Sequence, residues 1–65
     1  MENFGIRLKN LRQGSGLSIK ELASKVSVNA LMIKDWENNK RVLTIGRLIR
    51  IAQYFNVTVD YLVGL

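Results

Sequence analysis

Four residues with short polar side chains punctuate this sequence, and each stands before a segment with helically spaced apolar residues. They are Ser18, Asn29, Thr44 and Thr58. A side-chain oxygen at such a position accepts a hydrogen bond from a backbone N–H of the first helical turn, so these residue types favour helix starts. Glu21, three residues after Ser18, completes the spacing of a capping box. The chain is therefore expected to form a series of short helices, because no segment of useful length alternates as a strand would.

Five helices are predicted from the apolar periodicity. The sequence GSG at 14–16 ends the first helix, and the second should stop near Ser27. Asn39 suits the left-handed backbone at the end of the third helix, and the fourth should close at Asn56. The residues expected to pack inward are Phe4, Leu8 and Leu11 in the first helix, Ile19, Leu22, Ala23 and Val26 in the second, Ile33 and Trp36 in the third, Ile45, Leu48, Ile49, Ala52 and Phe55 in the fourth, and Val59, Leu62 and Tyr61 in the fifth. The predicted fold class is all-α.

The chain has 65 residues, with no Cys and no His, and a single domain over 1–65 is expected. Disulfide bonds, Cys/His zinc sites and Cys/His nucleophile pairs are excluded, so packing must supply the stability and the composition suits a reducing cytoplasm. Residues 1–10 lack the apolar core of a signal peptide, and no apolar run approaches the roughly 18 residues of a membrane span. No cofactor is expected.

Charge indicates the class of partner. Ten Lys and Arg residues against five Asp and Glu residues give a net charge of +5. Such a balance favours polyanions such as nucleic acid, although a solvated basic surface explains it equally well. The carboxylates, Glu2, Glu21, Asp35, Glu37 and Asp60, form no recognisable pair of acid and base. Because a domain this small also leaves little room for a cleft, no enzymatic activity or small-molecule substrate is expected. A membrane role is not expected either, because the core is expected to use the apolar face of each helix.

Residues 18–38 have the spacing of a helix-turn-helix, in which two short helices are joined by three or four residues. Ala23 provides a small side chain where the helices cross, and Val28 follows the turn. Ile33 and Trp36 anchor the second helix of the motif. An ordinary helical bundle, whose helices carry Leu, Ile and Ala at similar spacing, is the alternative.

Four stretches in order, FGIRLKNLR, GLSIKELASKVSV, IKDWENNK and IGRLIRIAQYFNVTVDYLVG, are similar to the Cro/C1-type helix-turn-helix regulators of phages and bacteria. The resemblance spans nearly the whole chain. It implies a compact five-helix, lambda-repressor-like domain whose third helix enters the major groove, usually as a dimer on a two-fold symmetric operator. It also implies that any homodimer, which would be weak, forms near Val57, Tyr61, Val63 and Leu65.

The same resemblance implies a fold-holding ion pair between Arg12, at the end of the first helix, and Glu37, late in the third. Three positions depart from the family pattern. Ile19 replaces a Gln that often contacts phosphate, Ser27 replaces a turn residue that is often Gly, and Leu43 replaces a frequent Pro. We therefore expect one phosphate contact to be missing and some strain at Ser27 if the left-handed conformation is kept.

The outward face of the third helix admits a first interpretation, in which it reads double-stranded DNA. A wheel with Ile33 and Trp36 buried turns Leu31, Lys34, Asp35 and Asn38 outward and puts Ala30 and Met32 on the flanks. The predicted contact residues are Asn29, Ala30, Leu31, Lys34, Asp35 and Asn38 on this helix, with Lys40, Arg41 and Thr44 placed for phosphates and Arg47, Lys20 and Lys25 as further cations. Ala30 and Leu31 would touch thymine methyls, and Asp35 would accept a hydrogen bond from a cytosine amino group.

In a second interpretation the same face binds protein. Ala30, Leu31 and Met32 form an apolar patch ringed by Lys34 and Asp35, as at a protein interface. The partner would be another repressor protein, and the chain would be an antirepressor or co-repressor with weak DNA binding of its own. A third possibility is that Leu31 and Met32 pack within the fold or in a homodimer contact.

Overall fold

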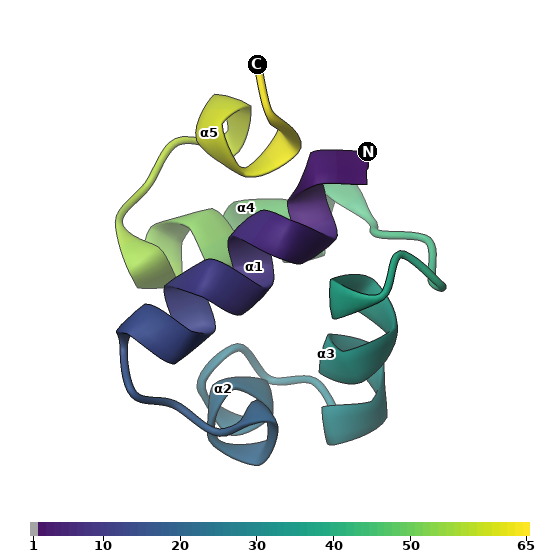
Figure 1. Ribbon diagram of the computed structural model, residues 1–65, viewed down its shortest axis with the longest axis vertical. Coiled ribbons are helices and arrows are strands. Elements are labelled where there is room, and N and C mark those ends of the chain that lie inside the picture. The colour runs from purple at the N-terminus through teal and green to yellow at the C-terminus, as the bar shows by residue number, and fades with distance from the viewer. Residues whose placement is uncertain (1) are drawn as a thin grey trace.

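The computed structural model describes residues 2–65, which form five α-helices and no strand (Figure 1). The helices are α1 (Glu2–Gly14), α2 (Ile19–Lys25), α3 (Ala30–Glu37), α4 (Ile45–Phe55) and α5 (Val59–Val63). The prediction of an all-α, five-helix fold is confirmed. No helix in this part of the chain is long and apolar enough to cross a membrane.

Four helices begin at the predicted capping residues. Ser18 Oγ accepts a hydrogen bond from the N–H of Glu21 at 3.0 Å, and the Glu21 carboxylate accepts one from the N–H of Ser18 at 2.9 Å, which completes the capping box. The other caps bond in the same way: Asn29 Oδ1 to the N–H of Met32 (2.9 Å), Thr44 Oγ1 to the N–H of Arg47 (3.4 Å) and Thr58 Oγ1 to the N–H of Tyr61 (3.0 Å). Each bond satisfies a backbone donor that the helix itself leaves without a partner.

Three residues other than glycine have left-handed backbone in the connections between helices. Asn39 (φ 56°) adopts this conformation at the end of α3, as predicted, and Asn56 (φ 55°) adopts it where the fourth helix was expected to close. Ser27 adopts it after α2 with φ 61°, so the turn keeps a conformation that costs a residue with a Cβ about 1 kcal/mol. Arg50 of α4 donates a hydrogen bond to Ser27 Oγ at 3.1 Å. This bond ties α4 to the turn between α2 and α3.

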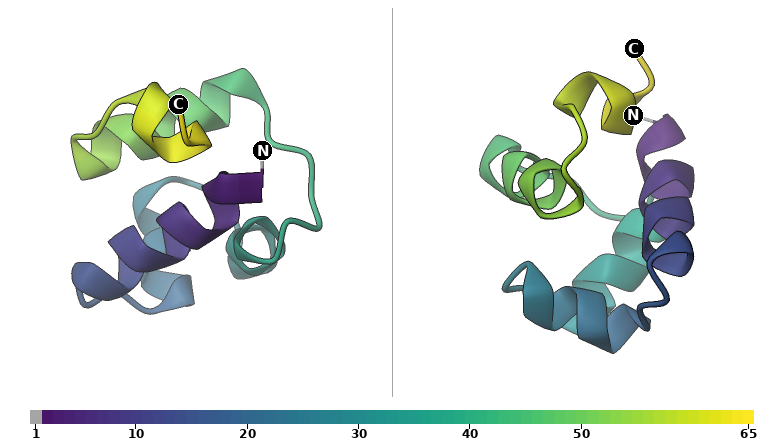
Figure 2. Two further views of the ribbon diagram at one scale, coloured as in Figure 1. Left: turned by 45° about the horizontal axis from the view of Figure 1, so that its top comes forward. Right: turned by 90° about the vertical axis from the view of Figure 1, so that its left-hand side faces the viewer.

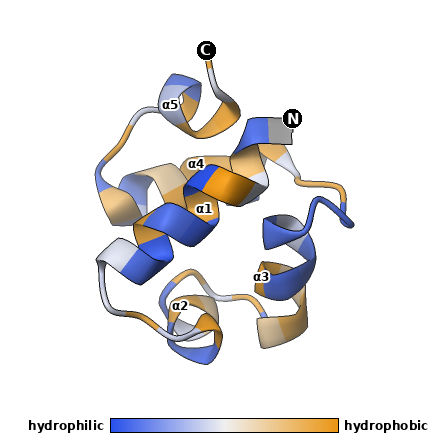
Figure 3. Cartoon of the chain, viewed as in Figure 1, coloured by the Kyte–Doolittle hydropathy of each residue, from blue (hydrophilic) through white to orange (hydrophobic). Residues whose placement is uncertain are grey.

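In Figure 1, α1 runs across the middle of the molecule, with α2 and α3 below it, α5 above it and α4 behind it, and Figure 2 shows the same arrangement from two other sides. The hydropathy changes around the helices, as amphipathic helices require (Figure 3). Phe4 of α1 and Trp36 of α3 meet edge to face with ring centroids 6.5 Å apart. The buried core consists of Phe4, Leu8, Leu22, Ala23, Val26, Met32, Ile33, Trp36, Leu48, Ile51, Ala52 and Leu62.

The buried face of α4 differs from the predicted one. Ile45 and Ile49 were expected to pack inward, but they are 68% and 42% exposed. Ile51, which was not expected to pack inward, is 1% exposed. Because Leu48 and Ile51 are three residues apart, they share a face that lies rotated from that of Ile45 and Ile49. The expectation was wrong because the 45/49 pair also has helical spacing, and only the position of the neighbouring helices selects between the two faces.

Candidate nucleic-acid interface

The α2–α3 unit has the geometry of a helix-turn-helix. Ala23 is buried where the two helices pack, and its carbonyl accepts a hydrogen bond from the N–H of Val28 at 3.0 Å. This bond closes the turn through the left-handed Ser27. α3 therefore leaves the turn in a fixed direction, with one face on the core and the other outside.

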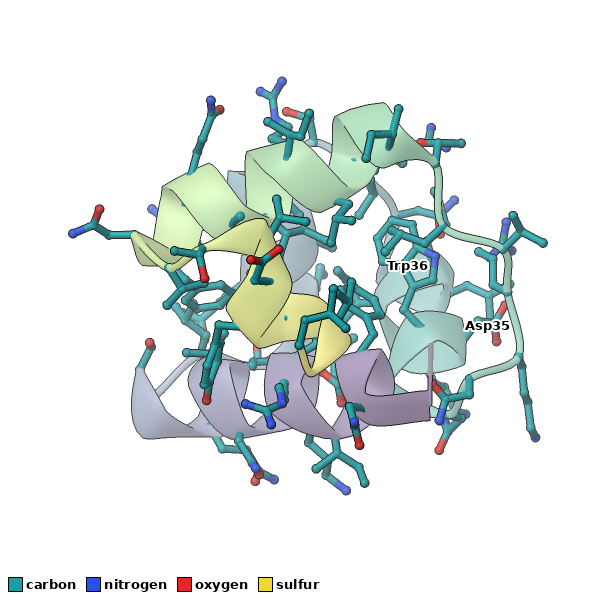
Figure 4. The ribbon with its side chains drawn as sticks, turned by 90° about the horizontal axis from the view of Figure 1, so that it is seen from above. Asp35 and Trp36 are labelled. Atoms are coloured by element: carbon teal, nitrogen blue, oxygen red, sulfur yellow. The ribbon has the colours of Figure 1, made fainter. Side chains whose placement is uncertain are left out.

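Two side chains fix α3 to the core. Ile33 and Trp36 are 0% and 1% exposed, and the Trp36 indole N–H donates a hydrogen bond to the carbonyl of Val42 at 3.3 Å. That bond holds the segment after α3 against the helix, as Figure 4 shows around the labelled Trp36. The rotation of α3 about its axis is thereby set, and with it the identity of the outward residues.

Arg12 and Glu37 form a second tie between helices. Arg12 Nε and one terminal nitrogen donate to the two Glu37 carboxylate oxygens at 2.6 and 3.0 Å, and the other terminal nitrogen donates to the carbonyl of Leu17 at 3.0 Å. Both side chains are almost buried. The hydrogen bond with Glu37 raises the pKa of Arg12 above its ordinary value, so the guanidinium stays charged. The pair joins the ends of α1 and α3 and offers a ligand little exposed surface.

The outward face of α3 carries Ala30, Leu31, Lys34 and Asn38, all of which are exposed. Leu31 is 59% exposed. The Asn38 side-chain amide donates a hydrogen bond to the carbonyl of Lys34 at 2.9 Å. The face therefore presents one cation, one amide and two apolar side chains.

Met32 does not belong to this face. The second interpretation made it part of an exposed apolar patch, but it is only 9% exposed and lies in the core, in agreement with the third possibility, that it packs within the fold. The physical reason is that Met32 and Trp36 are four residues apart and therefore share a face of α3. The proposed protein-binding patch is thus reduced to Ala30 and Leu31.

Asp35 and Arg41, expected to act separately on base and phosphate, lie together. Asp35 Oδ2 is 3.3 Å from both Nε and a terminal nitrogen of Arg41, and the carboxylate side chain is 24% exposed. The carbonyl of Asp35 also accepts a hydrogen bond from the N–H of Lys40 at 2.8 Å. Sequence reasoning missed this pair because the two residues are six apart, a spacing at which helical neighbours do not meet. The left-handed Asn39 folds the chain back and brings them together.

Charge over the motif and the helix that follows it is strongly asymmetric. Residues 18–50 carry seven Lys or Arg residues, all exposed: Lys20, Lys25, Lys34, Lys40, Arg41, Arg47 and Arg50. The three carboxylates of the same segment are each engaged within the chain, Glu21 by Ser18, Asp35 by Arg41 and Glu37 by Arg12. The backbone N–H of Ser18, and after it the Ser18 side chain, lowers the pKa of Glu21 below its ordinary value. The surface field here is therefore dominated by cations.

The residues expected at a homodimer contact are only partly accessible. Val57 and Val63 are half-buried, whereas Tyr61 and Leu65 are 40% and 91% exposed. The guanidinium of Arg7 lies over the Tyr61 ring, 4.6 Å from its centroid, which the sequence pattern did not predict. This contact joins α1 to α5.

A buried α2–α3 crossing and an outward-facing second helix define a helix-turn-helix domain. A sequence model of the family described as helix-turn-helix domain matches residues 5–65, and the chain belongs to this family. The match confirms the resemblance to helix-turn-helix transcriptional regulators that the sequence predicted.

Individual relatives agree with this family. The chain is 32% identical over 62 residues to the HTH-type transcriptional regulator ImmR of Bacillus subtilis (strain 168), a match that covers 95% of the chain and 49% of ImmR. It is 33% identical over 61 residues to the HTH-type transcriptional activator BcrR of Enterococcus faecalis, covering 94% of the chain and 30% of BcrR. The crystal structure of an HTH_3 family transcriptional regulator from Vibrio cholerae superposes with a TM-score of 0.82 at 27% identity, covering 95% of this chain and 35% of that one. The chain thus spans about half or less of the length of these proteins.

Proposed function

We propose that this protein is a Cro-like transcription regulator that binds operator DNA in the cytoplasm, with α3 in the major groove. The observation that carries the proposal is the charge pattern of residues 18–50, where seven cations are exposed and all three carboxylates are engaged internally. When Lys and Arg side chains of this surface neutralise DNA phosphates, they release the counterions condensed on the DNA, and that release supplies a large share of the affinity. Membership of the helix-turn-helix family supports the same function.

The proposed base contacts come from the outward face of α3. Lys34 and Asn38, with Asn29 at the cap, offer hydrogen-bonding groups to base edges, and Ala30 and Leu31 offer apolar groups to thymine methyls. Phosphate contacts are proposed for Lys40 and for Thr44, where the N–H groups at the start of the eleven-residue α4 favour an anion. Arg47 is exposed in the first turn of α4 and adds a cation there.

Two lysine substitutions test this assignment. Lys34→Ala should relax base preference at one position by about 1 to 3 kcal/mol, whereas Lys40→Ala should weaken binding to all duplexes alike and lower the salt slope by about 1. Affinity is measured by fluorescence anisotropy at several salt concentrations, with duplexes from upstream of the protein's own gene and with random-sequence duplexes. Lys9→Ala, an exposed lysine on α1, makes the same change in charge outside the motif and is the matched control. Equal salt slopes for the wild type and Lys40→Ala would count against phosphate binding by Lys40.

A second candidate function is favoured by Leu31, which is 59% exposed in the first turn of α3. In that case the protein is an antirepressor or co-repressor, and Ala30, Leu31, Lys34 and Asp35 contact another repressor. The burial of Met32 makes this apolar surface small, so DNA is the preferred partner. The Leu31→Asp variant tests the protein-binding candidate. If the protein binds a repressor through this face, the variant should fail to pull down the repressor encoded by the neighbouring gene. Its unfolding midpoint should stay nearly unchanged.

Binding to a two-fold symmetric operator would use two copies of the chain. We propose that their contact includes the exposed Tyr61 and Leu65, with Val57 and Val63 beneath. Sedimentation of the free protein and of the complex with a palindromic duplex measures the number of copies in each. Two copies on DNA and one in solution is the expected result for a weak contact.

A further inference from the structure

The pairing of Asp35 with Arg41 places an ion pair at the edge of the surface proposed to meet DNA. Asp35 Oδ2 accepts from Arg41 Nε at 3.3 Å, and a terminal nitrogen of the same guanidinium lies at 3.3 Å from the same oxygen. Figure 4 shows Asp35 at the margin of the molecule, where α3 meets the segment that follows it. Arg41 retains 39% exposure of its side chain and Asp35 24%, so both groups can be reached from outside.

The two groups respond in opposite ways to a phosphate. Arg41 would be attracted to it and the Asp35 carboxylate repelled. For Arg41 to give its fork of N–H donors to a phosphate, it must leave the carboxylate. Asp35 is then a partly buried anion that has lost its cation, which is unfavourable unless another donor replaces the guanidinium.

DNA itself can provide that donor, but only at certain base pairs. In the major groove the cytosine N4 amino group is a donor from which a carboxylate accepts. The adenine N6 donor stands beside the N7 acceptor, which disfavours a carboxylate, and guanine presents only acceptors there. We propose that Asp35 determines specificity by an exchange of ion-pair partner. On non-cognate DNA, Asp35 keeps Arg41 and withholds one cation from the phosphates; on cognate DNA, a cytosine amino group takes the carboxylate and releases Arg41 to a phosphate. This inference rests on the proposed function.

The exchange does not require the loop to unfold. The N–H of Lys40 bonds to the backbone carbonyl of Asp35 at 2.8 Å, and the Trp36 indole holds the carbonyl of Val42 at 3.3 Å. Neither bond uses the Asp35 carboxylate. Replacing Asp35 by Asn should therefore leave the 40–42 segment in place while removing the charge that competes for Arg41.

A double-mutant cycle tests the competition directly. The wild type, Asp35→Asn, Arg41→Gln and the double variant are titrated with one random-sequence duplex at four or more salt concentrations. Arg41→Gln should barely change the salt slope in the wild-type background, but it should lower the slope by about 0.9 in the Asp35→Asn background, because each phosphate neutralised contributes that amount. Asp35→Asn alone should tighten binding to the random duplex by about tenfold.

Asp60→Asn is the matched control, because it makes the same change in net charge on α5, outside the motif. It should tighten binding far less than Asp35→Asn. Unfolding midpoints are compared for all variants, and Asp35→Ser replaces Asp35→Asn in the cycle if the latter lowers the midpoint. An equal effect of Arg41→Gln in the two backgrounds would overturn the proposal, as would equal tightening by Asp35→Asn and Asp60→Asn.

Selection from a random duplex library tests the second half of the exchange. DNA bound by the wild type should be enriched in a C·G pair at one position of each half-site, and Asp35→Asn should lose that preference while other positions keep theirs. An unchanged base preference would overturn the proposed role of Asp35 in reading sequence. A different result marks failure of the underlying function: if the wild type and every variant bind no duplex even at low salt, the protein is not a DNA reader at all.

Discussion

At the scale of single residues, Arg12 connects several parts of the fold by hydrogen bonds. Its guanidinium bonds to both carboxylate oxygens of Glu37 and to the carbonyl of Leu17, so one side chain joins α1, the loop before α2 and the end of α3. A buried ion pair adds little stability compared with a well-packed apolar pair of similar volume. Removing one member is nevertheless strongly destabilising, because the other remains as a buried charge without a partner.

Arg12→Met should therefore lower the free energy of unfolding by about 3 kcal/mol or more, since Glu37 would remain as an uncompensated buried carboxylate. Urea denaturation followed by circular dichroism measures the loss. Adding Glu37→Gln to Arg12→Met should recover part of it. The matched comparison is Arg41→Gln, which breaks a more exposed pair and should cost less than about 1 kcal/mol. Similar losses for Arg12→Met and Arg41→Gln would contradict this account.

Glu21 makes a pH-dependent contribution through the capping box. Its pKa is lower in the folded chain than its ordinary value of 4.5, because the Ser18 N–H bonds to the carboxylate. The folded state thus binds the proton less tightly than the unfolded state, and the contribution is present above about pH 4.5 and lost as the pH falls below it. Glu21→Gln keeps an acceptor but not the charge, so the stability difference from the wild type should shrink between pH 7 and pH 3. A constant difference over that range would refute the assignment.

At the scale of helices, the approach of α1 to α3 depends on a glycine. A Cβ at Gly5 would lie 2.7 Å from the carbonyl oxygens of both Trp36 and Glu37, and 2.9 Å from Asn39 Oδ1. Backbone oxygens at the end of α3 cannot move aside as a flexible side chain could. Only glycine allows the two helices to pack this closely.

Gly5→Ala is expected to destabilise the fold by roughly 1 to 3 kcal/mol, because a methyl group must push α1 away from α3. Gly46→Ala is the matched control. A Cβ at Gly46 meets nothing within 4 Å, and alanine favours the helix, so this substitution should stabilise by up to about 1 kcal/mol. Thermal unfolding of the two variants measures the contrast. Gly5→Ala as stable as the wild type would show that the helices do not need this close approach.

At the scale of the whole molecule, a chain of 65 residues has little stability to lose. A chain of this length is expected to be stable by roughly 3 to 10 kcal/mol, and its single core comes from all five helices. The short α5 contributes Leu62 to this core, where its side chain is 0% exposed.

Leu62→Ala should therefore cost about 2 to 5 kcal/mol, through lost burial and the cavity left behind, and leave a large unfolded population at 37 °C. Leu31→Ala is the control with the same substitution at a 59% exposed position, and it should change stability by less than about 0.5 kcal/mol. Hydrogen exchange of the α1 backbone amides reports whether loss of the Leu62 side chain opens the whole core. Protection of α1 that survives Leu62→Ala would mean that α5 unfolds separately.

Local hydrogen bonding made much of this fold predictable from the sequence. The caps at Ser18, Asn29, Thr44 and Thr58 and the helix ends at Asn39 and Asn56 each depend on residues within a few positions, so helix starts and ends could be inferred without a structure. The helix-turn-helix followed from these helices together with the small Ala23 at their crossing.

Tertiary packing alone decided which of two helical faces is buried. Met32, Ile45 and Ile49 are all apolar at helical spacing, yet the first is buried and the other two are exposed, because the neighbouring helices cover one side of α3 and one side of α4. Tertiary structure also decided which residues of the candidate site lie together. Asp35 and Arg41 meet because Asn39 reverses the chain, a contact that neither residue's local pattern encodes. The sequence by itself determined where helices begin and end, since short-range bonds do that; the surface that meets a partner required the three-dimensional arrangement of all five.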